Sequence, residues 1–541
     1  LRCKPSRTKG HVVRPFSGHR WFNMKPRFVT SPDHAQVDTS SNGVGSMPSS
    51  SAIVIGSGFG GLALAIRLQS AGIATTLVEA RDRPGGRAYV WNRDGFTFDA
   101  GPTVITDPDC LKELWALSGS RIEDDVDLLP VQPFYRLLWN DGTRFEYTND
   151  DAQLNAEIAK LNPADVKGYA RFLEYSAGVY EEGYVKLGAV PFLDFASMLK
   201  AAPALAKHQA WQSVYAKVSS FVKDERLRQA FSFHTLLVGG NPMKTSSIYT
   251  LIHRLEKLGG VWFARGGTNA LVSGMVALFE RLGGQVLLNE KVVEITASGR
   301  RVTGVVTDTG RVLSAELVAS NGDLVHTYGL IKASDYAAKQ VRRLKRKKFS
   351  PSLFVVHFGL KGDFPDIAHH SILFSDRYKG LIEDIYKNGQ LAPDPSLYLH
   401  HPSITDPSMA PAGHSAFYAL APVPHMGRAP VDWAREGERY REVVLNRVRD
   451  MLIPDLYDRL VTSFHYPPQD FADDLGAHLG SAFSLEPLLT QSAWFRGHNR
   501  DDHYSNMYFV GAGTHPGAGI PGVVGSAKAT ASLIVPPQER R

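Results

Sequence analysis

The pattern of apolar and polar residues around position 50 predicts a strand, a tight turn, a helix and a second strand. Residues 52–55 are all apolar and run into Gly56, an alanine- and leucine-rich stretch follows Gly61, and Leu77 and Val78 come directly before Glu79. A short apolar run that ends in glycine is typical of a buried parallel strand, whereas the longer stretch has the length of a helix. The pattern therefore predicts the start of a doubly wound α/β domain.

Later regions show other periodicities. Residues 166–179 and 198–222 carry apolar side chains at helical spacing, which predicts an inserted helical region. Alternating residues at 301–307 and 311–319 flank a turn and predict a hairpin. Residues 350–480 are rich in Pro, Ser, Tyr and His with short apolar runs, which predicts a separate sheet.

These patterns predict a mixed α/β protein with three parts behind a basic leader. The expected division is a disordered leader at 1–47, a discontinuous nucleotide-binding domain at 48–130, 255–325 and 480–536, a helical region at 150–240, and a substrate domain at 131–149, 241–254 and 326–479.

Charge and cysteine content exclude several classes of function. The chain has 541 residues with 60 Lys and Arg against 54 Asp and Glu. The excess lies in the leader, so the rest of the chain is neutral and nothing indicates a nucleic acid partner. Only Cys3 and Cys110 are present, which excludes a disulfide framework and a cysteine metal site. No apolar run has the length of a membrane span.

The leader allows two interpretations. It is basic and poor in acidic residues, as transit peptides are, but Met47 stands directly before the first strand and would be a natural start. We therefore expect an upstream extension rather than a working targeting signal.

The first glycine turn has the spacing of a dinucleotide site. Gly56 allows the tight turn, Gly58 lets the backbone approach a pyrophosphate, and Gly61 lets the helix pack closely on the strand. Glu79 ends the second strand, where its carboxylate can accept a hydrogen bond from a ribose hydroxyl.

A second glycine-rich segment, residues 506–523, lies near the other end of the chain. Its bare backbone amides, followed by a helix N-terminus, can hold the far part of a long cofactor. Gly85, Gly86 and Arg87 add a close turn and a cation after Glu79. Because the chain has only one complete dinucleotide motif and two glycine segments, FAD fits better than NAD.

Together, the turn at 56–61, Glu79, the Gly-Gly-Arg at 85–87, residues 99–103 and the segment 506–525 resemble the bacterial-type carotenoid desaturases over residues 50–536. The resemblance implies a Rossmann-like FAD-binding domain of the glutathione-reductase and amine-oxidase type, with noncovalent FAD and a hydrocarbon channel. It also implies stepwise removal of hydrogen pairs from the forty-carbon polyene phytoene, giving lycopene. The cofactor-binding residues that we expect are Gly56, Ser57, Gly58, Phe59, Gly60, Gly61, Glu79, Ala80, Gly86, Arg87, Gly101, Pro102, Thr103, Val292, Gly513, Thr514 and Val523.

The same resemblance implies a lipid-dissolved substrate and therefore a peripheral enzyme on the cytoplasmic face of a membrane. Residues 184–222 mix apolar and basic side chains, as does the basic run 339–348, and both are candidates for contact with lipid. Each is also consistent with an ordinary helix on the body of the protein. Oxygen or a membrane quinone is the expected electron acceptor.

No catalytic base is predicted. Glu486, His515 and Lys200 are candidates that a helix cap, a loop or an uncertain position explains equally well. No metal site is predicted either, because the pairs at 369–370 and 400–401 have no further ligands near them in sequence.

Three alternatives remain open. One is a desaturase of the same family that acts on the thirty-carbon diapophytoene or stops after fewer steps. Another is a non-catalytic prenyl-binding chaperone on the same fold. An amine oxidase is disfavoured, because the sequence has no recognisable flavin-linking cysteine pattern.

Overall fold

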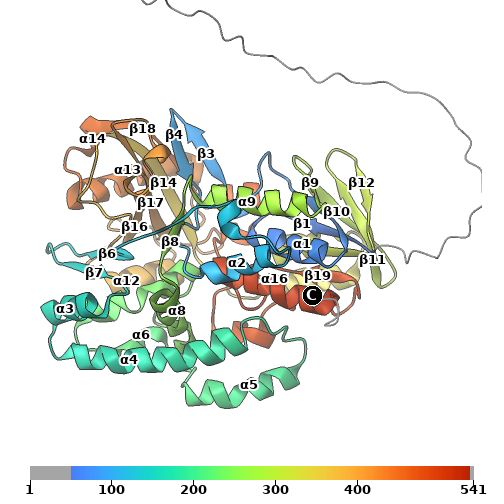
Figure 1. Ribbon diagram of the computed structural model, residues 1–541, viewed down its shortest axis with the longest axis horizontal. Helices are drawn as coiled ribbons and strands as arrows, with labels where there is room; N and C mark the ends of the chain where they lie inside the picture. The colour runs from blue at the N-terminus through green and yellow to red at the C-terminus, as the bar shows by residue number, and fades with distance from the viewer. Residues whose placement is uncertain (1–49, 536–541) are drawn as a thin grey trace, which may run out of the picture. The chain divides into compact units, whose positions relative to one another are not determined.

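The computed structural model describes residues 50–535 (Figure 1). The two largest β-sheets of this part of the chain have five and seven strands. These residues belong to one compact unit that begins at Ser49. The predicted leader at 1–47 lies outside the described residues. None of the described helices combines the length and the apolar character needed to cross a bilayer.

The first sheet is parallel and confirms the predicted strand-helix-strand unit. Its strands, in spatial order, are β19 (Met507–Phe509), β13 (Leu317–Ser320), β1 (Ser51–Ile55), β2 (Ala74–Val78) and β9 (Gln285–Leu287). Helix α1 (Phe59–Ser70) connects β1 to β2, and α2 (Pro108–Ala116), α9 (Thr268–Arg281) and α16 (Ile520–Ile534) share one hydrophobic core with it.

Both faces of β1 are buried, which explains its continuous apolar run. Ala52 and Val54 face the core under α1, whereas Ile53 faces a second core with α10 (Leu324–Gly329) and α11 (Asp335–Leu344). Successive residues of a strand point to opposite faces, so a strand covered on both sides needs apolar residues throughout.

The predicted hairpin is correct only in its first part. β10 (Val292–Ser298), β11 (Arg301–Thr307) and β12 (Val312–Ser314) form an antiparallel sheet. Beyond Ser314 the chain leaves this sheet and enters the parallel sheet as β13, because the continuously apolar residues 317–319 are buried beside β1. The alternation therefore ends earlier than the sequence predicts.

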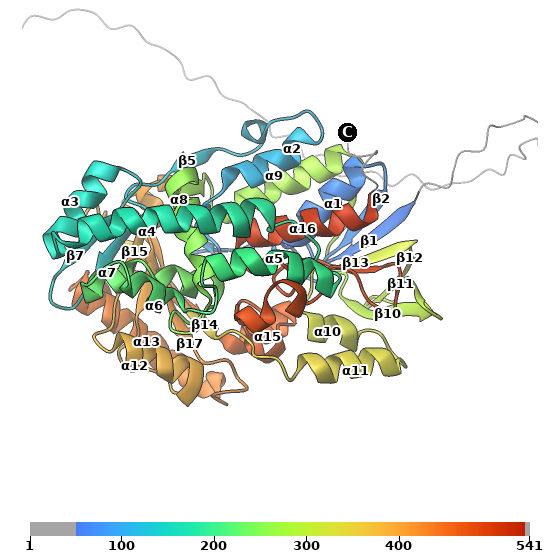
Figure 2. The same cartoon turned by 90° about the horizontal axis from the view of Figure 1, so that it is seen from below.

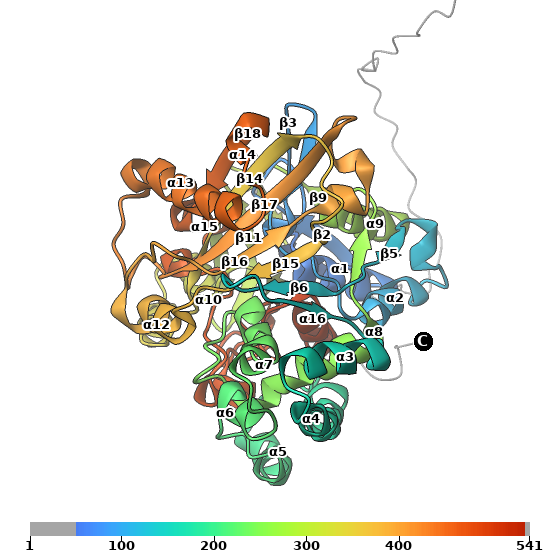
Figure 3. The same ribbon diagram turned by 90° about the vertical axis from the view of Figure 1, so that its left-hand side faces the viewer.

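The second sheet is mixed and has seven strands. Their spatial order is β18 (Leu460–Tyr466), β14 (Ser352–Lys361), β17 (His414–Val423), β16 (Leu397–His400), β15 (His370–Leu373), β6 (Tyr135–Leu138) and β7 (Arg144–Tyr147). One face packs on α13 (Trp433–Met451), and the other faces the interior (Figure 3).

A helical layer lies along one side of both sheets. It contains α3 (Asp151–Leu161), α4 (Asp165–Tyr180), a π-helix at Glu181–Lys186, α5 (Phe195–Lys207), α6 (Val214–Ser219), α7 (Glu225–Ala230) and α8 (Leu251–Gly259). Figures 1 and 3 show α4 and α5 at the bottom, and Figure 2 shows them crossing in front of the other elements.

The second stretch of predicted helical spacing, residues 198–222, is divided between two helices. α5 ends at Lys207, and α6 begins at Val214. Gln209 has a φ of 52°, a left-handed conformation that ends a helix.

The strand regions therefore follow the expected segments, while the exact domain limits stay a prediction. The parallel sheet draws its strands from residues 51–78, 285–287, 317–320 and 507–509. The seven-stranded sheet draws its strands from 135–147 and 352–466. Along the chain, α12 (Tyr378–Glu383) and α14 (Leu456–Arg459) lie between strands of the seven-stranded sheet, and α15 (Pro468–Leu475) follows β18.

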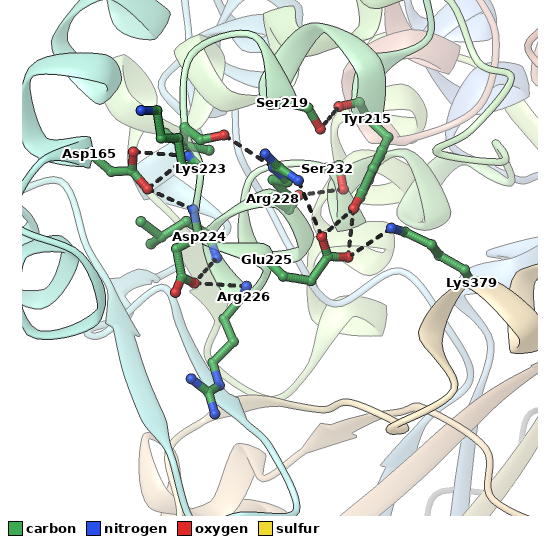
Figure 4. Close-up of polar contacts among 12 residues, drawn as sticks. Asp165, Tyr215, Ser219, Lys223, Asp224, Glu225, Arg226, Arg228, Ser232 and Lys379 are labelled. Carbon is green, nitrogen blue, oxygen red and sulfur yellow. Dashed lines mark hydrogen bonds and ion pairs between the residues drawn. The ribbon is translucent and has the colours of Figure 1, made fainter.

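A buried carboxylate fixes one end of the helical layer (Figure 4). Asp165, at the start of α4, accepts hydrogen bonds from the backbone N–H of Lys223, at 2.9 Å, and of Asp224, at 2.8 Å. Glu225, the first residue of α7, accepts the Tyr215 hydroxyl at 2.6 Å and lies 3.3 Å from Lys379 Nζ of α12. These contacts join α4, α6, α7 and α12.

Replacing Asp165 with Ala should lower the free energy of unfolding by about 3 kcal/mol, because several buried donors lose a charged acceptor. Urea unfolding followed by circular dichroism measures this change. Lys223→Ala is the control, since only its backbone meets Asp165. Equal stability of the Asp165→Ala variant and the native protein would contradict the role of this carboxylate.

Candidate cofactor and substrate site

A single cavity of about 650 Å³ runs from the carboxyl ends of the parallel strands to the helical layer. Most of the predicted cofactor residues lie in its wall, although the predictions were made from distant parts of the sequence. The predicted residues in the wall are Gly56, Ser57, Gly58, Phe59, Gly60, Glu79, Ala80, Gly86, Arg87, Gly101, Pro102, Thr103, Val292 and Val523.

The first glycine turn is shaped by close contacts that leave no room for side chains. Gly56 has a φ of 90°, and its N–H donates to the Val78 carbonyl at 2.8 Å. A Cβ added to Gly61 would lie 2.0 Å from the Gly56 carbonyl oxygen. Gly61 itself lies behind the wall, so its contribution is the close packing of α1 on β1.

The N-terminus of α1 opens toward the cavity. No side chain caps it, and its first turn contains no acidic residue. Gly58, Phe59 and Gly60 all lie in the cavity wall. Free backbone N–H groups at a helix N-terminus favour a phosphate group.

Glu79 lies at the end of β2, as predicted, and its carboxylate also holds the glycine turn. Its Oε2 accepts the Ser57 N–H at 2.8 Å and the Ser57 hydroxyl at 2.5 Å, and its Oε1 accepts the Arg81 N–H at 3.0 Å. Each carboxylate oxygen has two lone pairs, so Oε1 keeps capacity to accept a ribose hydroxyl.

Arg87 places a cation in the wall that has few partners within the protein. Its Nε has no hydrogen-bond partner, and its NH2 group makes only a long hydrogen bond of 3.5 Å to the Ser481 carbonyl. Burial lowers the pKa of the guanidinium, and the nearby Asp323 carboxylate opposes that shift. An under-paired, partly buried cation beside a free helix N-terminus fits the pyrophosphate of a dinucleotide.

Residues 101–103 are held against the wall by the seven-stranded sheet. The Tyr418 hydroxyl donates to the Gly101 carbonyl at 2.9 Å and lies 2.7 Å from the Thr103 hydroxyl. Tyr398 approaches the same hydroxyl at 2.9 Å. This polar cluster fixes the segment where the nucleotide-binding loops meet the second sheet.

The late glycine segment meets the first glycine turn. A Cβ added to Gly60 would lie 3.2 Å from Gly511 Cα, so the two backbones are in contact. The uncapped N-terminus of α16 opens to the cavity through Gly519, Ile520 and Val523.

Two predicted residues of this segment do not line the cavity. The Thr514 side chain is fully buried and bonds to Ser526 at 2.6 Å, and Gly513 packs against Leu324. Their neighbours Ala512 and His515 line the wall instead. Contact of Gly513 and Thr514 with a cofactor therefore stays a prediction that only their backbone can satisfy.

Arg496 explains how this segment is held. Its buried guanidinium donates to the carbonyls of Ala512, at 2.6 Å, and of Thr514, at 3.1 Å. In a trans peptide the N–H points opposite to the carbonyl, so the N–H groups of Gly513 and His515 point away from Arg496. Burial lowers the pKa of this guanidinium.

The remainder of the wall is apolar and comes from elements that the sequence did not connect. α5 contributes Met198, Ala201 and Leu205, and the seven-stranded sheet contributes Ile372 and Leu420. A cavity that joins phosphate-binding loops to a hydrocarbon surface suits a dinucleotide and a large apolar substrate.

Sequence reasoning missed several residues of the wall. Asn321 and Asp323 follow β13, and Asn321 packs beneath the first glycine turn. Their signal was the polar triplet 321–323 directly after a buried strand. Glu256 and Tyr398 also line the cavity, but nothing in their local sequence indicates this position.

The histidine pairs are closer together than the sequence argument assumed. One ring nitrogen from each of His369, His370 and His400 lies within 4.8 Å of the others. The fold therefore places a third potential metal ligand beside the first pair. The antiparallel pairing of β15 with β16 brings them together. Burial keeps the pKa of each imidazole well below its ordinary value. His369 Nε2 and His400 Nε2 lie 3.1 Å apart, within hydrogen-bond distance of each other.

One apolar cavity is surrounded by two glycine loops, two open helix N-termini and the partly buried Arg87, an arrangement that defines a dinucleotide-binding flavoprotein of the amine-oxidase fold. The chain belongs to the family of flavin-containing amine oxidoreductases, whose family model matches residues 59–535. This match confirms the predicted fold class and flavin cofactor type.

Curated relatives narrow the comparison. The chain is 63% identical over 485 residues to the lycopene-forming phytoene desaturase of Paracoccus sp., covering 90% of this chain and 97% of the relative. It is 44% identical to the neurosporene-forming phytoene desaturase of Cereibacter sphaeroides, covering 89% and 94%. The structure of a putrescine oxidase aligns with a TM-score of 0.61 at 16% identity, over 90% of this chain and 99% of that chain, which shows the shared fold. The predicted family is therefore confirmed.

Gly61→Ala should reduce the amount of FAD that copurifies by about ten-fold or more, because the added Cβ overlaps the Gly56 carbonyl and displaces the turn. The ratio of flavin to protein absorbance measures the loss. Gly329→Ala is the matched control, since nothing lies within 4 Å of its added Cβ. Full flavin content in the Gly61→Ala protein would contradict the assigned packing role.

Proposed function

We propose that this chain is an FAD-dependent phytoene desaturase that converts phytoene stepwise to lycopene. The observation that carries this proposal is one cavity whose wall joins the dinucleotide-binding loops to an extended apolar surface. The 63% identity to a lycopene-forming relative supports this substrate and product.

The protein residues bind and orient. Arg87 and the N-terminus of α1 would hold the pyrophosphate of FAD, Glu79 would hold its ribose, and the segment that follows Gly511 would contact the far part of the cofactor. Bound FAD supplies the oxidant, which accepts two electrons with one hydrogen from the substrate. The apolar wall from α5 and the seven-stranded sheet aligns the hydrocarbon and excludes water.

Purified protein with FAD and phytoene-loaded liposomes should form lycopene when oxygen or a quinone is present. Under nitrogen without quinone, the reaction should stop after the bound flavin is reduced. Pigment spectra measure the products, and the arm with quinone under nitrogen separates the two acceptors. Product from diapophytoene alone would favour the thirty-carbon desaturase. A colourless protein that forms no product in any arm would favour the chaperone.

We propose further that α5 rests on a membrane and admits the substrate. The helix is apolar on both sides: Met198 and Leu205 line the cavity, whereas Phe195 and Leu199 on the other side are 50% and 59% exposed. Trp211, just beyond α5, is 67% exposed. A helix that separates a hydrocarbon cavity from an exposed apolar surface suits a bilayer as its outer partner.

A basic segment beside α5 supports the same orientation. No described ion pair joins the cationic side chains of residues 339–348 to a carboxylate. Lys347 Nζ donates to the Phe495 carbonyl at 2.9 Å, and neighbouring Trp494 packs on Phe195 with ring centroids 5.2 Å apart. Lys347 of this segment therefore lies near the exposed apolar end of α5, where an anionic headgroup would meet it. A peripheral position on the cytoplasmic face is part of this proposal.

The double variant Phe195→Gln with Leu199→Gln should bind vesicles containing phosphatidylglycerol about ten-fold or more weakly, because each buried apolar side chain contributes about 1.5–3 kcal/mol. Vesicle flotation measures the bound fraction, and added salt should weaken native binding further. Val312→Gln, at a 68% exposed position of β12, is the control. Unchanged binding of the double variant would exclude α5 as the contact.

A further inference from the structure

The apolar part of the cavity reaches α12, a helix far from the nucleotide-binding loops. Figures 1, 2 and 3 each show α12 well separated from α1, where the first glycine turn lies. Four residues of α12 and of the π-helix Asp384–Asn388 that continues it line the cavity wall, and each is 2% exposed. These are Tyr378, Leu381, Ile382 and Ile385. The cavity therefore extends from the cofactor end to the inner face of α12.

The outer face of the same segment is charged and meets water. Its exposed residues alternate with the wall residues at helical spacing and are Asp376, Arg377, Lys379, Glu383 and Lys387. This pattern is that of an amphipathic helix, whose apolar face points inward. A hydrocarbon chain that passed this helix would move from an apolar wall into water, which is unfavourable. The α12 side of the cavity is therefore closed to hydrocarbon, in contrast to α5 with its exposed Phe195 and Leu199.

Packing closes the cavity at this helix. Leu381, Ile382 and Ile385 belong to one hydrophobic cluster, and Leu236 of the 3-10 helix Phe233–Val238 packs against it. Leu236 itself lines the cavity wall. Two sides of the wall therefore meet where this 3-10 helix contacts α12.

Aromatic rings border the last part of the cavity before α12. The ring of Phe374 lies 6.3 Å from that of Phe233 and 5.6 Å from that of Tyr378, measured between centroids, and all three residues line the wall. Large flat side chains with few rotamers give this end of the cavity a defined shape.

Ion pairs connect α12 to its neighbours from the outside. Arg377 lies 3.0 Å from Asp394, in the segment before β16, and Lys379 lies 3.3 Å from Glu225 of α7 (Figure 4). Each exposed pair contributes little to stability. Together they link α12 to two separate segments, which fixes the position of its inner face.

We propose that the inner face of α12, centred on Ile382, is a stop for one end of the polyene and so sets the length of hydrocarbon that the enzyme accepts. This inference rests on the proposed function. A substrate without polar groups offers only its shape for recognition. When one end of such a chain rests on a fixed stop, a fixed carbon–carbon bond lies beside the bound cofactor.

The physical basis of this selectivity is close packing. Protein interiors have the density of organic crystals, so a wall does not yield to an additional carbon without strain. One methylene more or less in an apolar pocket changes kcat/KM by about 10- to 200-fold. A stop at the end of the cavity therefore discriminates between chains that reach it and chains that are shorter.

Ile382→Phe places additional carbon atoms at the stop. Its kcat/KM for phytoene, measured in liposomes with bound FAD and a quinone, should fall about ten-fold or more. The thirty-carbon diapophytoene is shorter and can lie clear of the stop, so its inhibition constant against phytoene conversion should stay within two-fold of the native value. Ile382→Ala removes packing from the last carbons of phytoene and should show a smaller loss of the same kind. It tests the proposal if the Phe variant does not fold.

Ile367→Phe is the matched control, because Ile367 is another buried isoleucine, 5% exposed, that packs in a different core outside the cavity wall. It should leave the ratio of the two constants unchanged. An equal loss for both hydrocarbons, or native values for phytoene in both Ile382 variants, would overturn the inference. A native enzyme that diapophytoene does not inhibit would also overturn it, because a cavity with a stop should admit the shorter chain. No conversion of phytoene by the native protein would instead overturn the proposed function.

Discussion

The contact between the first and last glycine loops is the constraint on which the rest of the structure depends. β1, β13 and β19 lie side by side in the parallel sheet, so the turns that follow β1 and β19 emerge at the same edge. Gly60 and Gly511 then meet backbone to backbone, with Asn321 packed against both. A side chain at either glycine would separate the two loops, and a cofactor that needs both would lose one half of its site.

This contact also decides where a substrate can lie. The seven-stranded sheet reaches the loops through Tyr398, Tyr418 and Thr103, and the helical layer closes the opposite side. The wall of the cavity between them consists of backbone amides and Arg87 at one end and of apolar side chains at the other. Such a change of polarity along one cavity suits a polar cofactor beside a substrate without polar groups, which is then oriented by the shape of the apolar wall.

The helical layer combines rigidity at one end with exposure at the other. Asp165 and Glu225 fasten α4, α6, α7 and α12 through charged hydrogen bonds. None of the described ion pairs involves α5, which has Met198 and Leu205 in the cavity wall and leaves Phe195 and Leu199 exposed. A firmly held end and an apolar helix beside the cavity are consistent with the membrane contact proposed for α5.

Local sequence was sufficient to predict the features that depend only on residues close together along the chain. The turn at Gly56–Gly61, the position of Glu79 and the strand-helix-strand unit could be predicted because glycine conformations and apolar periodicity are local properties. The resemblance to carotenoid desaturases extended this to Gly101, Val292 and Val523, which the structure places in the same wall. It did not distinguish Gly513 and Thr514 from Ala512 and His515, because the direction of a side chain in a loop depends on what packs behind it.

The amino-acid sequence by itself therefore determined the class of fold and the nucleotide end of the site. Tertiary structure alone decided which residues form the hydrocarbon end. Strand pairing brought His369, His370 and His400 together and turned residues 317–320 out of the expected hairpin. It also brought Met198 and Leu205 of α5 into the same wall as Ile372 and Leu420 of the seven-stranded sheet. Burial and partnership between distant segments are set by packing, and a pattern along one segment contains no record of what the fold will place against it.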